Sequence, residues 1–208
     1  YTILFVGRRQ MCIRDRLGGT YGTADAPDAV AARNAVASGV ISVAAVDHAE
    51  TFPGAVLTTA DGHRIQAINA NDAKLASTYN VVILKDDPAT EEDESLGCSE
   101  QAYRSNGITS GANQLAVSTR GGCARIARAV HAQKAGAAAA AMINTDDTLP
   151  SFEGPITGNP DTGEEYEVTI PFLGIRGPLG AKSDGDTLHG ADGTTITLQG
   201  NSAANSEY

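Results

Sequence analysis

The run from Gln114 to Ile143 constrains the fold of this chain more than any other part of its 208 residues. It begins with the apolar stretch QLAVS and turns at 119–122. It continues as the helical pattern CARIARAVHAQKA, which Gly136 ends, and then as the small apolar stretch AAAAAMI. A strand, a helix and a strand within about thirty residues match the span of a right-handed crossover between parallel strands. The sequence therefore predicts an α/β fold.

Further strands are predicted on both sides of this unit. The segment Tyr79–Lys85 (YNVVILK) is the clearest, and two later strands are expected at Ile170–Ile175 and Gly193–Leu198. Between residues 51 and 80, short apolar stretches broken by Pro and Gly indicate small strands and turns. The last residues, 200–208, have the composition of a disordered tail.

The amino-terminal part has a different character. Residues 1–16 hold four arginines against one acid, and we interpret this segment, Cys12 included, as non-native sequence outside the fold. From Thr23 to Gly39 the alanine-rich pattern predicts a helix, which the apolar strand 40–46 follows. One helix and one strand cannot cover both faces of a sheet, so this piece resembles the edge of a larger α/β layer.

Composition excludes several classes of function. Apolar residues make up 41% of the chain and charged residues 19%, which fits neither a disordered chain nor a membrane protein. The formal net charge of -10 repels phosphate backbones and anionic lipid headgroups. Neither nucleic acid nor a membrane is therefore an expected partner. The acidic run DDPATEEDES at 86–95 is interpreted as a solvated loop.

The order of motifs in the second half resembles the protease-associated (PA) domain. The shared features are LAVSTRGGC, an alanine-rich helix, KAGAAAAAMIN, TIPFLGI and DGTTITL. Within them, Arg120, Gly121 and Cys123 match an R-G-x-C motif, and 135–137 match A-G-A. The resemblance implies a swivelling β/β/α fold of small sheets with a crossover helix over residues 57–199.

The segment 17–56, with ISVAAVD at 41–47, is similar to secreted subtilisin-like serine proteases that carry such a domain as an insert. The resemblance implies a non-catalytic fragment of an extracellular peptidase of that family, which contacts protein or peptide substrates and limits access to the active site. Two alternatives remain open: a stand-alone PA module, or the PA insert of a metal-dependent aminopeptidase. The oxyanion-hole Asn segment expected between 40 and 41 is missing, as are the triad motifs.

The same resemblance implies a disulfide between Cys98 and Cys123, which secreted relatives use. The chain has three cysteines, and setting Cys12 aside leaves these two. Their pairing would close a loop of about 25 residues and stabilise the fold by about 3 kcal/mol. Two unrelated thiols remain the alternative.

The sequence gives little support for any catalytic residue. Ser110, in GITSGA, lacks the helix entry that follows a subtilase nucleophile, and adjacent Asp47 and His48 point to opposite faces of a strand. His63, His131 and His189 are expected on the solvated surface. No HExxH or paired CxxC motif occurs, so neither a metal nor another cofactor is predicted.

One loop is the candidate contact surface. Residues 145–167 lie beyond the predicted strand ends and include Phe152 and Tyr166, the two residues proposed to contact a protein or peptide substrate.

Overall fold

The computed structural model describes residues 34, 51–177 and 183–204, and side chains as far as residue 201. The chain divides into two compact units, Tyr1–Val46 and Asp47–Tyr208. Of the first unit only Asn34 is described, in a helix and exposed. Residues 1–33, which include Cys12, and residues 35–50, which include Asp47 and His48, lie outside the described part. The fold below is that of the second unit.

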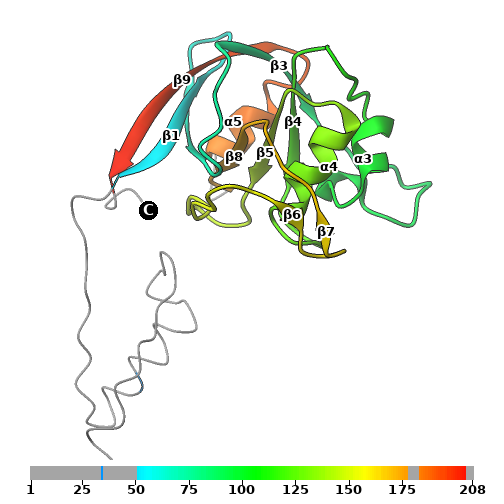
Figure 1. Cartoon of the computed structure of the whole chain (residues 1–208). Coiled ribbons are helices and arrows are strands. Elements are labelled where there is room, and N and C mark those ends of the chain that lie inside the picture. The colour runs from blue at the N-terminus through cyan, green and yellow to red at the C-terminus, as the bar shows by residue number, and fades with distance from the viewer. Residues whose placement is uncertain (1–33, 35–50, 178–182, 205–208) are drawn as a thin grey trace, which may run out of the picture. The chain divides into compact units, whose positions relative to one another are not determined.

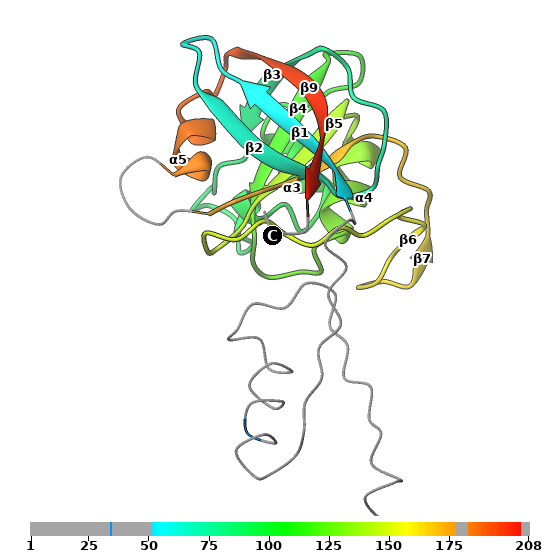
Figure 2. The ribbon, with the colours of Figure 1, turned by 90° about the vertical axis from the view of Figure 1, so that its left-hand side faces the viewer.

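Seven strands close into a barrel in the order β1-β2-β8-β5-β4-β3-β9, shown in Figures 1 and 2. Their bounds are β1 Thr51–Thr58, β2 Arg64–Asn69, β3 Thr78–Ile83, β4 Gln114–Thr119, β5 Ala139–Ile143, β8 Phe172–Ile175 and β9 Thr195–Ala204. A separate two-stranded hairpin consists of β6 (Gly158–Asn159) and β7 (Glu164–Glu165).

The barrel has a parallel half and an antiparallel half. Strands β3, β4, β5 and β8 run parallel, whereas β1 pairs with β2 and β9 in antiparallel register. The parallel strands are the apolar runs that sequence predicted. Strands β4, β5 and β8 are buried on both faces, whereas Thr78 and Asn80 of β3 are exposed. Their inward side chains join those of the other strands in one core, which includes Leu57, Ile65, Val81, Leu115, Val117, Ala141, Ile143, Leu173, Ile196 and Leu198.

The crossover helix α4 (Ala127–Ala135) connects β4 to β5. It ends at Gly136, whose positive φ of 103° suits a residue without a Cβ, and whose N–H donates to the carbonyls of Ala132 and Gln133. The alanines 139–141 of β5 are fully buried and small, so α4 can approach the sheet closely. The mixed α/β fold predicted from this segment is confirmed.

Three short helices complete the unit. They are η1 (Glu94–Leu96), α3 (Glu100–Ser105) and α5 (Asp184–His189). Ser99 caps α3 by accepting a hydrogen bond from the Ala102 N–H, and Ser183 caps α5 by accepting from Asp186. Helix α3 packs against α4 on one side of the barrel.

The structure differs from the sequence prediction in four places. Strand β9 continues to Ala204 and pairs with β1, so residues 200–204 are not a disordered tail. Residues 184–189, for which the sequence pattern predicts no element above, form helix α5. Helix α4 begins at Ala127, not at Cys123. The predicted domain boundary at 56/57 falls inside β1, so the barrel begins at least as early as Thr51.

Candidate functional site

The turn at 120–126, between β4 and α4, is organised by a buried arginine. The side chain of Arg128 is 0% exposed. Its Nη1 donates hydrogen bonds to the carbonyls of Cys123 and Ala124, each at 3.1 Å, and its Nη2 donates to the carbonyl of Gly121. Three backbone oxygens of the turn therefore point at one guanidinium. Sequence analysis missed this residue because arginine is rarely buried.

A disulfide fixes the same turn from the other side. Cys123 is bonded to Cys98, 25 residues earlier, with their Cα atoms 5.6 Å apart. Cys98 lies just before α3, so the bond ties the start of that helix to the turn before α4. The disulfide that the sequence resemblance implied is thus present in the structure.

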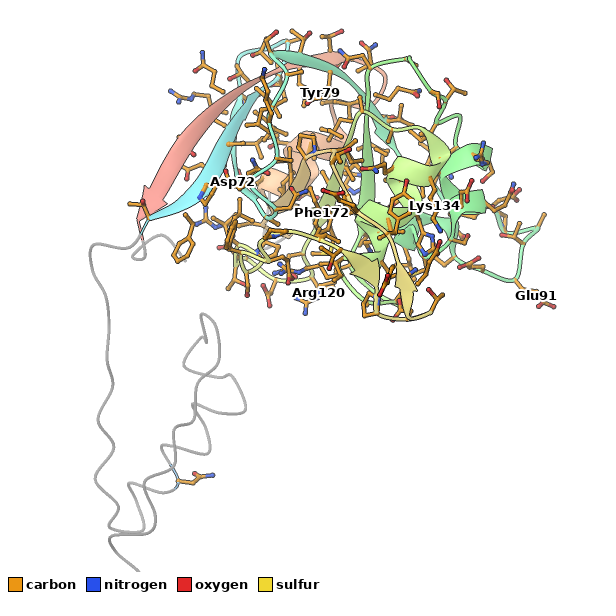
Figure 3. The ribbon with its side chains drawn as sticks, in the orientation of Figure 1. Asp72, Tyr79, Glu91, Arg120, Lys134 and Phe172 are labelled. Carbon is orange, nitrogen blue, oxygen red and sulfur yellow. A yellow bond between two sulfur atoms is a disulfide. The ribbon has the colours of Figure 1, made fainter. Side chains whose placement is uncertain are left out.

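Arg120 is presented to solvent at this turn. It follows the carboxyl end of β4, is exposed, and donates through Nη1 to Asn144 Oδ1 at 2.7 Å. Asn144, at the end of β5, is 2% exposed and itself donates to Asp146 Oδ1 and to the Thr148 carbonyl, both at 2.9 Å. Figure 3 places Arg120 on the opposite side of the barrel from Tyr79 of β3. The carboxyl edge of a parallel sheet is a common place for ligands.

The loop 145–167 lies across α4 and does not project freely. Gln133 of α4 accepts hydrogen bonds from the N–H groups of Thr169 (2.7 Å) and Ile170 (3.1 Å) through Oε1. Its Nε2 donates to the Glu167 carbonyl at 3.0 Å. Lys134 forms an ion pair with Glu164 of the β6–β7 hairpin. One helix face therefore holds the returning end of the loop.

Phe152 lies near the start of that loop and is half-buried. Its ring centroid is 6.0 Å from that of Phe52 on β1, with the two planes at 41°. The next residue, Glu153, forms an ion pair with Arg125 of the turn. Burial, and secondly the like charge of Arg120, lower the pKa of Arg125 to about 10. The Arg125–Glu153 pair therefore attaches the start of the loop to the turn that also contains Arg120.

Tyr166 occupies a different environment. It is half-buried, with Lys134 Nζ 5.1 Å from its ring centroid, and its hydroxyl accepts from Gln133 Nε2 at 3.3 Å. These contacts attach the ring to α4, whereas Phe152 packs against β1. Among the described contacts none joins the two rings, so the two predicted contact residues lie apart.

His131 of α4 is partly buried, where sequence analysis expected a solvated surface residue. Its Nε2 lies 3.4 Å from Asn159 Nδ2 in the β6–β7 hairpin. Burial, followed by the charge of Lys134, lowers the pKa of the imidazole. His63 and His189 are exposed, as expected.

A hydroxyl, a carboxylate and an imidazole do meet in the β1–β2 hairpin. Thr59 Oγ1 donates to Asp61 Oδ1, and His63 Nε2 lies 3.3 Å from Asp61 Oδ2. The carboxylate stands between the other two groups, whereas a hydrolytic triad needs the imidazole between hydroxyl and carboxylate. His63 and Asp61 side chains are 61% and 67% exposed. The Thr59 proton is directed at Asp61, so His63 is not positioned to accept it.

These three residues line a cavity of about 560 Å³, together with Asp184 and Asp186 of α5. The serine candidate, Ser110, lies elsewhere: it is exposed and packs against Gly136. In the described part of the chain, no cluster of three His, Cys, Asp or Glu side chains is arranged to hold a metal ion. Nor is any helix within residues 51–177 and 183–204 long and apolar enough to cross a bilayer.

Comparison with known proteins gives a family and a weak structural likeness. The model of the PA domain matches residues 77–188, more than half of the chain. Comparison of this chain with curated proteins gives no match. The zinc aminopeptidase BSAP from Bacillus subtilis is similar in structure, with a TM-score of 0.48 and 20% identity over 76% of the chain. An aminopeptidase from Aneurinibacillus sp. strain AM-1 gives a TM-score of 0.46 and 15% identity over 74%. The chain spans about a third of the length of either structure, 33% and 34%.

Proposed function

This chain belongs to the PA domain family, and on that premise we propose that its barrel is a non-catalytic module of a secreted peptidase, where it contacts protein or peptide substrates. The surface proposed for this contact consists of Arg120, Phe152 and the Arg125–Glu153 pair. We refer to these four residues as the contact surface.

The observation that carries the proposal is the way Arg120 is held. Its guanidinium is exposed, yet one nitrogen is anchored on the buried Asn144 and its backbone belongs to a turn fixed by Arg128 and the disulfide. An arginine whose orientation is already set loses little entropy when it binds. Its remaining N–H groups can donate to the carbonyl oxygens of a peptide.

Phe152 supplies the apolar part of the contact surface. The ring is held against Phe52 and remains partly exposed, so it can receive an apolar side chain of the bound peptide. Aromatic and arginine side chains are enriched at protein interfaces, and the contact surface offers one of each partly exposed.

The proposal covers two possible parents. The segment 17–56 resembles subtilisin-like serine proteases, whereas the alternative is an insert of a metal-dependent aminopeptidase. The aminopeptidase structures compared above share too little with this chain to decide between the two. The reading frame that flanks this sequence distinguishes them, because it would encode either a serine-nucleophile motif or metal-ligating residues.

A binding assay tests the contact surface. The probe is fluorescently labelled, reduced and carboxymethylated α-lactalbumin, an unfolded protein, and the measurement is fluorescence anisotropy. Arg120→Met and Phe152→Ala should each weaken binding by at least about fivefold, or about 1 kcal/mol. Tyr166→Ala, which frees the loop end from α4, should weaken it less.

Glu91→Gln is the matched control, because Glu91 lies in the exposed acidic loop far from the contact surface in Figure 3. Wild-type binding by Arg120→Met or by Phe152→Ala would refute the proposed surface. The non-catalytic part of the proposal has its own test: a fluorophosphonate probe should label no residue, and stoichiometric labelling would reverse that conclusion.

A further inference from the structure

The guanidinium of Arg128 is bonded to neutral groups rather than to a carboxylate. Its side chain is 0% exposed, and within the described ranges no carboxylate lies at ion-pair distance from it. Its Nη atoms bond to neutral carbonyls, and its Nε has no hydrogen-bond acceptor. A buried cation is costly unless it is paired, so this site favours any anion that can form beside it.

The atom placed to become that anion is the sulfur of Cys98. It lies 3.9 Å from Arg128 Nη2. The other groups that interact with Arg128 are Tyr103, Arg120 and Asp161. Burial raises the pKa of the Tyr103 phenol, which keeps it neutral, and Asp161 is engaged with the Ala124 N–H at 2.9 Å. Arg120 adds a second positive charge. The carbonyl oxygens of Gly121 and Leu96 lie 3.4 Å and 3.9 Å from the same sulfur and oppose a thiolate there, so the two cations must outweigh them.

We propose that the Cys98–Cys123 disulfide is a redox-exchangeable site, in which Cys98 leaves as a thiolate that Arg128 stabilises. Both cysteines are partly exposed, so a small thiol can reach the bond. A disulfide whose leaving thiolate is stabilised by a neighbouring cation breaks faster and is reduced more readily than an ordinary structural disulfide. This inference does not depend on the proposed function.

The reaction needs a dithiol reductant and balances in two steps. A reductant thiolate attacks Cys123 Sγ, the Cys98–Cys123 bond breaks, and its electron pair stays on Cys98 as the thiolate. The second reductant thiol loses its proton to solvent and attacks the reductant sulfur of the mixed disulfide. A cyclic disulfide of the reductant leaves, and Cys123 takes up a proton as a free thiol. Two electrons pass from the dithiol to the protein.

The exchange acts on the turn that presents Arg120. In the oxidised protein the disulfide and Arg128 together fix residues 121–124. Reduction removes the covalent tie to α3, leaving the turn held by Arg128 and by Asp161. The state of this disulfide therefore sets how firmly Arg120 is positioned.

The test measures the thiol pKa of each cysteine in the reduced protein. Cys12 is replaced by serine throughout, and the Cys12→Ser protein is reduced with dithiothreitol and pulse-alkylated with iodoacetamide between pH 5 and 10. Mass spectrometry of the peptides resolves the two sites. The Cys98 profile should have its midpoint at least about one unit below the ordinary value of about 8.5, and below that of Cys123.

Arg128→Met should raise the Cys98 midpoint by at least about one unit and lower the equilibrium constant for reduction by dithiothreitol about tenfold. Arg128→Lys, which keeps the charge, should restore most of both effects. If Cys98 and Cys123 both show alkylation midpoints near the ordinary value of about 8.5 in the Cys12→Ser protein, the proposal is overturned, and no Arg128 variant is needed to decide. The same conclusion holds if these midpoints arise because the reduced protein unfolds. A Cys98 midpoint that is low but unchanged in a folded Arg128→Met protein would also overturn it.

Discussion

Gln133 Oε1 accepts a hydrogen bond from the backbone N–H of Thr169 over 2.7 Å, although 36 residues separate the two. The same carboxamide accepts from Ile170 and donates to the Glu167 carbonyl and the Tyr166 hydroxyl. It thereby supplies the bonds that a neighbouring strand would otherwise provide, and it connects α4 to the loop that contains Phe152.

Replacing Gln133 by alanine should lower the free energy of unfolding by about 1 kcal/mol, because the partly buried N–H of Ile170 and two exposed backbone groups lose their partner. Urea denaturation measures this change. Limited proteolysis should also show new cleavage within 145–169. Gln101→Ala, at an exposed position of α3, is the matched control and should change neither property. Equal stability of the two variants would mean that the loop is held by its other contacts.

Gly136 should tolerate no side chain. At its φ of 103° an alanine is strained, and the new Cβ would also clash with Ser110 Oγ and lie 2.6 Å from Ser110 N. Gly107, at a φ of 82°, has open space where its Cβ would be. Gly107→Ala should therefore cost about 1 kcal/mol and Gly136→Ala at least about 3 kcal/mol. The difference in urea midpoint between Gly107→Ala and Gly136→Ala measures the cost of the clash with Ser110. If the two variants lose similar stability, Gly136 and Ser110 are not closely packed.

Removing the disulfide should destabilise the unit. A bond that closes a loop of 25 residues contributes about 3 kcal/mol by restricting the unfolded chain. In a Cys12→Ser background, the Cys98→Ser, Cys123→Ser double variant should lose about this amount in urea denaturation. A double variant that unfolds at the same urea concentration as its parent would show that the bond does not constrain the unfolded state.

His131 should make stability fall on acidification. Its pKa in the folded state is lowered, chiefly by burial, so below the unfolded value of about 6.5 the unfolded chain binds the proton more readily. The contribution of His131 to the stability of the folded protein is complete above about pH 6.5, and it decreases as the pH falls from there toward the pKa of His131 in the folded state. His131→Gln should therefore lose less stability than the wild type between pH 7.5 and 5.5.

Asp184 has the opposite effect on the pH dependence of stability, because burial raises the pKa of its carboxyl in the folded state. The comparison of wild type with His131→Gln removes this contribution, which is common to both proteins. Gln101→Ala, at an exposed position of α3 that has no ionisable side chain, is the control and should keep the wild-type pH dependence. If His131→Gln loses as much stability as the wild type between pH 7.5 and 5.5, another group causes the pH dependence.

The parallel half of the barrel could be predicted from the sequence because its signals are local. Apolar runs such as YNVVILK and QLAVS mark strands that contribute to the core, and Gly136 marks the end of α4. The second half of β9 carried no such signal. The residues QGNSAA have no apolar alternation, and they form a strand because β1 offers unpaired backbone groups along its whole length.

The organisation of the contact surface depends on contacts that no local pattern encodes. Residues 123–126 read as helix, but the disulfide, Arg128 and Asp161 hold them in a turn, and the helix starts at Ala127. Arg128 and Gln133 are residue types that usually lie on the solvated face of a helix. They are held in place because Cys98 and the segment that contains Thr169, both distant in sequence, pack against α4.

The pairing of Thr51 with Ala204 has a mechanical consequence. Strands β1 and β9 are antiparallel and meet at these two residues, so a pulling force applied at both would act on one end of the ladder. The hydrogen bonds would then break pair by pair, as in a zipper, rather than all together in shear. A barrel tethered at these points should open under small loads, and its rupture would start with the longest ladder it contains.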